Sequence, residues 1–151
     1  MKKSFIHSFE YNDWANKKII ENLNEIKDYP ERCVELISHI ISVQDYWYDR
    51  QVNKSIYLID LWEKYSLLEL NHLNQASTQM WMDYINKTKE KDFKELCGYF
   101  NEEGVALDIS VGDIINHILN HSAYHRGQIN LLLKTNNLEP VNIDFNEYAS
   151  F

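Results

Sequence analysis

Four segments of this chain carry apolar residues at the three- and four-residue spacing of a buried helix face. The pattern predicts helices from about Ser4 to Ile26, from Pro30 and Glu31 to about Arg50, from about Ser66 to Lys87, and a last one that ends near Thr135. Pro30 suits the first turn of a helix, where its missing N–H costs nothing. The chain is therefore expected to be all-α in its main elements.

The segments between these helices differ from one another. Residues 51–65 lack a sustained helical period, which indicates a long crossover. Residues 92–110 contain two short alternating runs separated by Asn-Glu-Glu-Gly, the signal of a small β-hairpin. Asp108, Ser110 and Asp113 can each cap the helix that follows. The tail after Thr135 is expected to pack as irregular chain.

Polar residues interrupt the apolar face of the first helix. One register contains Phe5, Phe9, Asn12, Asn16, Ile19, Leu23 and Ile26, and the other contains Ile6, Phe9, Asp13, Asn16, Ile20 and Leu23. Asn16 belongs to both registers, so we expect it to face the interior. A buried amide needs hydrogen-bond partners. Asn16 either bridges backbone groups or orients something inside the protein.

Three histidines follow one another at four-residue spacing in the last helix: His117, His121 and His125. Residues four apart share a helix face, so two of them can bind one metal ion. His117 and His125 lie about 12 Å apart along the axis, too far to share an ion. The pair is therefore 117/121 or 121/125. A histidine row without metal is the alternative interpretation.

The apolar register of the last helix favours the second pair. It contains Val111, Ile114, Ile118, His121, His125, Gln128 and Leu132. In the second helix, His39 lies on the apolar face formed by Leu36, Ile40, Val43 and Trp47. His39 is either a hydrogen-bonded core residue or a further ligand. The third helix is expected to bury Leu70, Leu73, Ser77, Met80 and Tyr84, with Trp81 alongside.

Composition narrows the class of protein. A chain of 151 residues with 44% apolar content is large enough for one domain, 1–151, with its own core. Its net charge of −8 argues against nucleic-acid binding. Cys33 and Cys97 are isolated, which suggests a reducing, cytoplasmic location. We find neither a signal-peptide pattern nor a membrane-spanning apolar run, so no membrane partner is expected.

Several motifs of known metal and nucleotide sites are missing from the sequence. It contains no H-E-x-x-H, P-loop or G-x-G-x-x-G, and only one E-x-x-H, Glu69 to His72, where ferritin-like di-iron bundles need two. The metalloprotease, nucleotide-binding and di-iron classes are therefore not expected.

Four stretches together resemble a known family. They are YNDWANKKII at 11–20, which includes Asn16, HIISVQDYWYDR at 39–50, HILNHSAYHRGQINLLL at 117–133, and LEPVNIDFNEY at 138–148. In this order they resemble the DinB-like (DinB/YfiT) family of proposed metalloenzymes. The His-Arg-Gly-Gln block is the most specific of the four.

The resemblance implies a four-helix bundle with a long crossover between helices 2 and 3 and a small β-hairpin between helices 3 and 4. It also implies one divalent metal, Zn²⁺ or Ni²⁺, held by His39, His121 and His125. His117 matches a position that is often His in the family but is not a usual ligand. Three imidazoles leave coordination positions open, as catalytic metal sites do.

The function implied is a metal-dependent enzyme, either a thiol-dependent S-transferase or a hydrolase acting on a small molecule. The nearest polar candidates for supporting roles are Asn16, Tyr124 and Arg126, although the last two suit a surface or an interface equally well. Trp14, Trp47 and Tyr124 are expected to line the cavity. The alternative is a non-enzymatic metal-binding or homodimeric stress-response bundle, and a homodimer is expected in either case.

Overall fold

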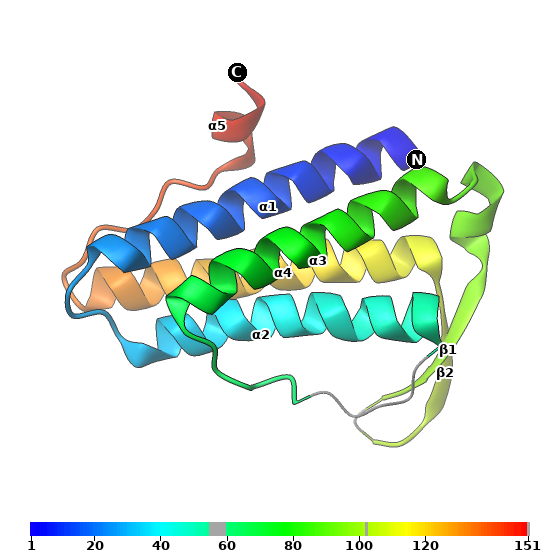
Figure 1. The fold of residues 1–151 in the computed structure, drawn as a ribbon, viewed down its shortest axis with the longest axis horizontal. Helices are drawn as coiled ribbons and strands as arrows, with labels where there is room; N and C mark the ends of the chain where they lie inside the picture. Colours follow the sequence, from blue (N-terminus) through cyan, green and yellow to red (C-terminus); the bar gives the residue numbers. More distant parts are fainter. Residues whose placement is uncertain (55–59, 102, 151) are drawn as a thin grey trace.

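The computed structural model describes residues 1–54, 60–101 and 103–150. Its main elements are four long helices that lie side by side: α1 (Lys2–Glu25), α2 (Glu31–Tyr48), α3 (Leu67–Lys87) and α4 (Val111–Thr135). Figure 1 shows α1 and α4 running in one direction and α2 and α3 in the other. The prediction of a four-helix bundle is confirmed.

Each long helix packs on two others. α1 contacts α3 and α4, and α2 contacts the same pair, so α1 and α2 occupy diagonal positions. Because α2 and α3 run in the same direction, the chain must return along the bundle between them. The predicted crossover at 51–65 has this role, although 55–59 lie outside the described residues.

The end of α2 differs from the prediction. The α-helix ends at Tyr48, and a π-helical turn, Asp49–Asn53, continues it past the predicted end at Arg50. Lys54 then adopts a left-handed conformation with φ of 53°, which stops the helix. The predicted crossover therefore begins as helix.

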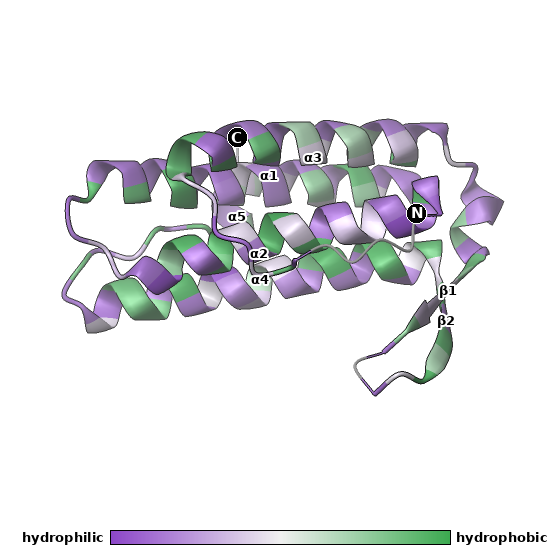
Figure 2. Ribbon diagram, turned by 60° about the horizontal axis from the view of Figure 1, so that its bottom comes forward, coloured by the Kyte–Doolittle hydropathy of each residue, from purple (hydrophilic) through white to green (hydrophobic). Residues whose placement is uncertain are grey.

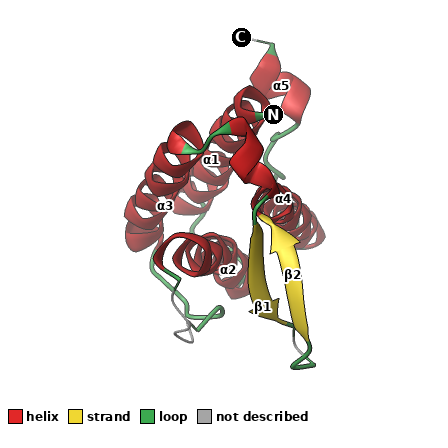
Figure 3. Cartoon of the chain, turned by 90° about the vertical axis from the view of Figure 1, so that its right-hand side faces the viewer, coloured by secondary structure: helices red, strands yellow, loops and turns green. Residues whose placement is uncertain are grey.

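The hairpin between α3 and α4 is confirmed. After a 3₁₀ turn (Glu90–Lys94), strands β1 (Leu96–Phe100) and β2 (Ala106–Ser110) pair antiparallel and project from one end of the bundle (Figures 1 and 3). Ser110 is the residue that caps α4, because its Oγ accepts from the Asp113 N–H. Asp108 is a residue of β2 and does not cap.

The tail contains a helix that the sequence pattern did not predict. α5 (Phe145–Ala149) is one short turn that rests on α1 through aromatic contacts of Phe145 and Tyr148 with Tyr11. Five residues are too few to display an apolar period, so periodicity could not reveal it.

The core consists of two apolar clusters with a polar layer between them. Each long helix carries both hydrophobic and hydrophilic bands in Figure 2. The cluster near the hairpin includes Phe9, Trp47, Trp81 and Ile114, and the cluster at the opposite end includes Ile19, Ile37, Leu70 and Ile129. The buried polar residues of the layer include Asn12, Asn16, Gln44, Asn74, Ser77, His125 and Arg126.

Hydrogen bonds across helices satisfy the amides of this layer. Asn12 Nδ2 donates to Gln44 Oε1 over 2.7 Å, and Gln44 Nε2 donates to Ser77 Oγ over 3.1 Å. Asn16 Nδ2 donates to Asn74 Oδ1 over 2.9 Å. The expected inward direction of Asn16 is confirmed. The first register of α1 describes the buried face better, because Asn12 is buried whereas Ile6 and Asp13 of the second are only partly buried.

The register predicted for α3 is confirmed at Leu70 and Ser77 and wrong at Leu73, Met80 and Tyr84. The buried residues are Leu70, Asn74, Ser77, Trp81 and Ile85, while Leu73, Met80 and Tyr84 are only partly buried. Hydrogen bonding explains the difference. Asn74 reaches Asn16, and the Trp81 indole N–H donates to the Gln44 carbonyl oxygen over 3.0 Å. The spacing of apolar residues alone cannot reveal hydrogen-bond partners on other helices.

None of the helices in the described ranges combines the length and apolar character that crossing a membrane requires.

A carboxyl group on α2 gives the fold a testable pH dependence. Burial raises the pKa of Asp45 from 3.8 to about 6, a nearby hydroxyl of Ser77 opposes the rise, and the charge of Asp49 adds to it. The folded state thus holds the Asp45 proton more tightly than the unfolded chain does, and the protein loses stability as pH rises through about 6.

We predict that Asp45→Asn raises the free energy of unfolding at pH 8 by up to about 3 kcal/mol. The gain should shrink as pH falls through about 6 and disappear near 3.8, where the unfolded carboxyl is also protonated. Denaturant unfolding of both proteins across this pH range measures it. An equal gain at every pH would contradict the assignment.

Candidate metal centre

Neighbouring faces of α2 and α4 bring three imidazoles together. The nitrogens that His39, His121 and His125 can offer to a metal ion all lie within 4.8 Å of one another. Nε2 of His121 is 3.1 Å from Nε2 of His39 and also 3.1 Å from Nε2 of His125. His117 lies outside this cluster, with its ring centre 5.6 Å from that of His121.

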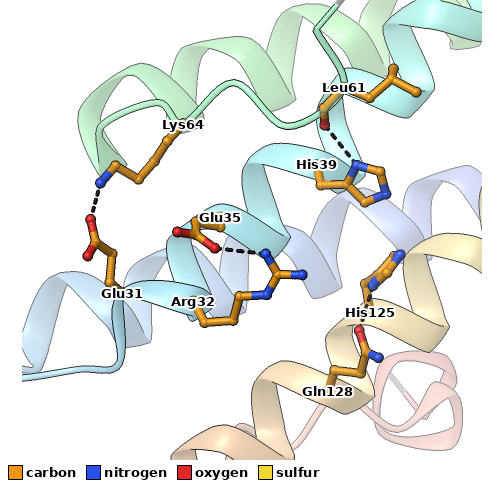
Figure 4. Close-up of polar contacts among 8 residues, drawn as sticks. All are labelled: Glu31, Arg32, Glu35, His39, Leu61, Lys64, His125 and Gln128. Carbon is orange, nitrogen blue, oxygen red and sulfur yellow. Dashed lines mark hydrogen bonds and ion pairs between the residues drawn. The ribbon is translucent and has the colours of Figure 1, made fainter.

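Hydrogen bonds orient two of these rings. His39 Nδ1–H donates to the Leu61 carbonyl oxygen, and His125 Nδ1–H donates to Gln128 Oε1, each over 2.7 Å (Figure 4). A neutral imidazole protonated at Nδ1 carries its lone pair on Nε2. His39 and His125 therefore direct unprotonated Nε2 atoms toward His121, as metal-binding histidines do.

The spacing of the three nitrogens fits a shared metal ion. Two ligand nitrogens at 2.0–2.1 Å from one tetrahedral ion lie about 3.3 to 3.4 Å apart. The 3.1 Å separations of the Nε2 atoms are close to this value. An imidazole donor set suits several divalent ions, zinc and nickel among them. These residues therefore form a candidate metal site.

The protonation state of the cluster favours the same role. Burial, together with the neighbouring imidazoles of His125, His39 and His117, lowers the pKa of His121 to about 3. Burial is also the main cause that lowers the pKa of His39, and the charge of Arg32 contributes. The neutral imidazole is the form that binds a metal, so these ligands need not release protons at neutral pH.

One aromatic residue of the site was not predicted. Trp62 stacks on the ring of His39 with 3.8 Å between ring centres and 3° between planes. The guanidinium of Arg32 lies 4.6 Å from the centre of the Trp62 ring. Trp62 is in the crossover, where no periodicity assigns a direction to a side chain. Its only signal in the sequence is a large aromatic residue in a segment of mixed polarity.

One ion pair links the crossover to α2 beside the site, and a second lies within α2. Lys64 pairs with Glu31, and Arg32 pairs with Glu35 at 2.7 Å (Figure 4). The first of these links the crossover to the start of α2. Exposed pairs of this kind contribute little stability.

The polar residues expected near the site occupy three different environments. Arg126 is buried, and its Nη1 donates to Asn12 Oδ1 over 2.6 Å and to Asn16 Oδ1 over 2.8 Å. The hydrogen bonds of Asn16 go to Arg126 and Asn74, so its partners are not the histidines. Tyr124 is 65% exposed, with its ring 5.1 Å from that of His125.

The expected aromatic lining is only partly present. Trp47 contacts the rings of Tyr99 and His117. The prediction is wrong for Trp14, whose ring packs against Tyr11 and Tyr148 on the side of α1 that α5 covers. Trp14 lies on the partly exposed side of α1, where the register of that helix turns it away from α2.

The structure explains three of the four residues of the His-Arg-Gly-Gln block. His125 faces the cluster, Arg126 turns about 100° further toward α1, and Gln128 returns to the face of His125. Gly127 is exposed, and a Cβ added there would have no neighbour within 4 Å, so nothing in the structure explains a glycine at this position. The motif thus combines one candidate ligand, its orienting acceptor and a buried anchor.

Comparison with known proteins agrees with this arrangement. The chain is 23% identical over 155 residues to Protein DinB of Bacillus subtilis (strain 168), a match that covers 93% of this chain and 90% of that protein. The sequence model of the DinB family matches residues 1–151, which confirms the resemblance drawn from the four motifs. This chain therefore belongs to the DinB family.

Proposed function

We propose that this protein is a divalent-metal-dependent enzyme that transfers a low-molecular-weight thiol to a small electrophilic molecule. The observation that carries the proposal is the convergence of three imidazoles, two of them oriented through Nδ1, on one point between α2 and α4. His39, His121 and His125 would hold the ion, with zinc or nickel as the metals proposed.

When bound, an ion with three neutral donors keeps its full charge and open positions, and it lowers the pKa of a thiol or water that reaches it. The residues of the chain orient the ligands and shape the approach. Leu61 and Gln128 fix the rings of His39 and His125. Trp62 and Tyr124 are 46% and 65% exposed beside these rings, so they offer apolar contact to a bound molecule.

An external thiol is favoured over a thiol of the chain. Burial raises the pKa of Cys33 to about 11, so this thiol is a poor nucleophile at neutral pH. In the transfer, the sulfur of the external thiol forms a bond to the electrophilic carbon. The leaving group departs with the bonding electron pair, and the thiol proton is released. Hydrolysis of a small molecule would use the same site with water as the nucleophile.

We further propose a homodimer whose partners are small molecules and do not include nucleic acid or membranes. The charge of −8 supports the absence of nucleic acid, because phosphate contacts need basic surfaces. The alternative, a non-enzymatic metal-binding or stress-response bundle, uses the same histidines without turnover. Activity assays separate the two.

Metal analysis of protein purified without a histidine tag should find about one ion per chain. Most of this metal should be lost in each of the variants His39→Ala, His121→Ala and His125→Ala, because only two imidazoles would remain to hold the ion. His117→Ala is the matched control and should retain it, since His117 lies outside the cluster. Loss of metal in His117→Ala with normal content in His125→Ala would overturn the assignment.

Replacing the acceptor behind His125 should weaken the site without removing a ligand. We predict that Gln128→Leu lowers metal affinity about 10- to 100-fold, because the His125 ring loses the partner of its Nδ1–H. Gln128→Glu keeps an oxygen acceptor and should retain most of the affinity. Competition with a chelator of known affinity measures both variants. Unchanged affinity in Gln128→Leu would refute the orienting role.

Turnover should depend on the metal and on the thiol. We predict that metal-loaded protein, assayed with a panel of low-molecular-weight thiols and small electrophiles, is active while His121→Ala is inactive. The reason is that an ionised thiol at the open position requires the three-histidine set. Equal turnover by the two proteins would place the chemistry elsewhere. A metal-loaded protein without turnover on any pair would favour the non-enzymatic alternative.

A further inference from the structure

A second site is indicated on the other side of α4, around the buried guanidinium of Arg126. This side chain is only 1% exposed. Its Nη1 donates hydrogen bonds to the neutral amides of Asn12 and Asn16, and its Nε has no partner among the residues that the structure describes. The nearby Tyr11 contributes a ring 5.6 Å from the guanidinium carbon.

This arrangement leaves a buried positive charge with neutral partners. None of the ion pairs formed within the described residues involves Arg126. Arginine stays protonated in proteins, and a buried charge is costly unless an opposite charge accompanies it. The missing component of this site is therefore an anion.

A cleft of about 280 Å³ lies against Arg126. α1, α4 and α5 supply its walls, with Tyr11, Asn12, Asn116, Asn120 and Phe145 among the lining residues. The two asparagines of α4 add amide donors, and the aromatic rings restrict the space. The volume is near the lower end of small-molecule pockets, which suits a ligand of a few heavy atoms.

The cleft is separate from the histidine cluster. At about 100° per residue, Asn116 and Ala123 project from the side of α4 opposite His121 and His125. Figure 3 shows α2, which carries His39, on one side of α4 and α5 on the other. A ligand in the cleft therefore cannot be one that is bound at the metal centre.

We propose that this cleft binds a small oxyanion, a carboxylate or a phosphate group, through Arg126. The guanidinium offers a planar fork that matches two oxygens of either group. The Asn116 and Asn120 amides are placed to donate to the remaining oxygens, and Phe145 and Tyr11 enclose the ligand. The proposal goes beyond the metal-dependent reaction and does not require it.

The test uses acetate and inorganic phosphate as probes, with chloride at equal ionic strength as the reference. Binding is measured by calorimetry and by the shift of the thermal unfolding midpoint, in the wild type and in His121→Ala. The second protein excludes anions held at the metal centre, and it should bind as the wild type does. The probe that binds more tightly identifies the oxyanion class.

Two sets of variants decide the role of Arg126. Arg126→Gln should weaken binding at least about tenfold, because a charged hydrogen-bond donor is lost. Ala123 lines the cleft three residues before Arg126, so Ala123→Asp places a carboxylate beside the guanidinium. It should abolish binding of both probes and raise the unfolding midpoint without them. Ala123→Asn, of the same size but uncharged, should bind normally.

Two results would overturn the proposal. One is a wild type that responds to neither probe beyond the chloride reference. The other is equal binding of the probes by Ala123→Asp and Ala123→Asn. This comparison remains valid even if Arg126→Gln fails to fold.

Discussion

Polar groups buried in the middle of the bundle must find partners, and this requirement fixes how the four helices meet. Leaving one buried donor or acceptor without a partner costs about 1–3 kcal/mol, more for a charged group. Asn16 of α1 needs Asn74 of α3 and Arg126 of α4, and Gln44 of α2 needs Asn12 and Ser77. The apolar clusters on either side can accept other apolar side chains of similar volume, whereas this layer depends on specific hydrogen-bond partners.

The same layer determines where the histidines point. Arg126 follows His125 directly, so the two side chains leave α4 about 100° apart. Once Asn12 and Asn16 hold the guanidinium against α1, the rotation of α4 about its own axis is set, and His121 and His125 must face α2. His39 meets them there because the apolar face of α2 packs on both α3 and α4. The buried arginine thus positions the candidate metal ligands without touching them.

How far the sequence predicts this arrangement depends on the kind of contact. The four helices and the inward pair His121 and His125 follow from spacing along one helix, which a sequence displays directly. The residues around His39 left two roles possible, a core residue or a ligand, and only the family resemblance assigned it as a ligand. The reason is that its contact with α4 is a contact between helices, which spacing along one helix does not reveal. The register of α3 was wrong at Leu73 and Met80. Asn74 and Trp81 take the interior positions instead, because their hydrogen-bond partners lie on α1 and α2. Trp62 lies in a segment without periodicity, so nothing in the sequence directs it onto His39.

Electrostatics keeps the histidine cluster in the form that a metal requires, even though the protein as a whole is acidic. The chain carries 23 carboxylate side chains against 15 lysines and arginines. A carboxylate next to the imidazoles would raise their pKa and favour protonation. The acceptors that contact His39 and His125 are instead uncharged, the Leu61 carbonyl and the Gln128 amide, and the cation of Arg32 acts on His39. Burial and this cation both lower the pKa of His39, and burial is the main cause that lowers the pKa of His121. The neutral acceptors orient the Nδ1 protons without stabilising a second proton on Nε2, so the lone pairs that converge between α2 and α4 remain available at neutral pH.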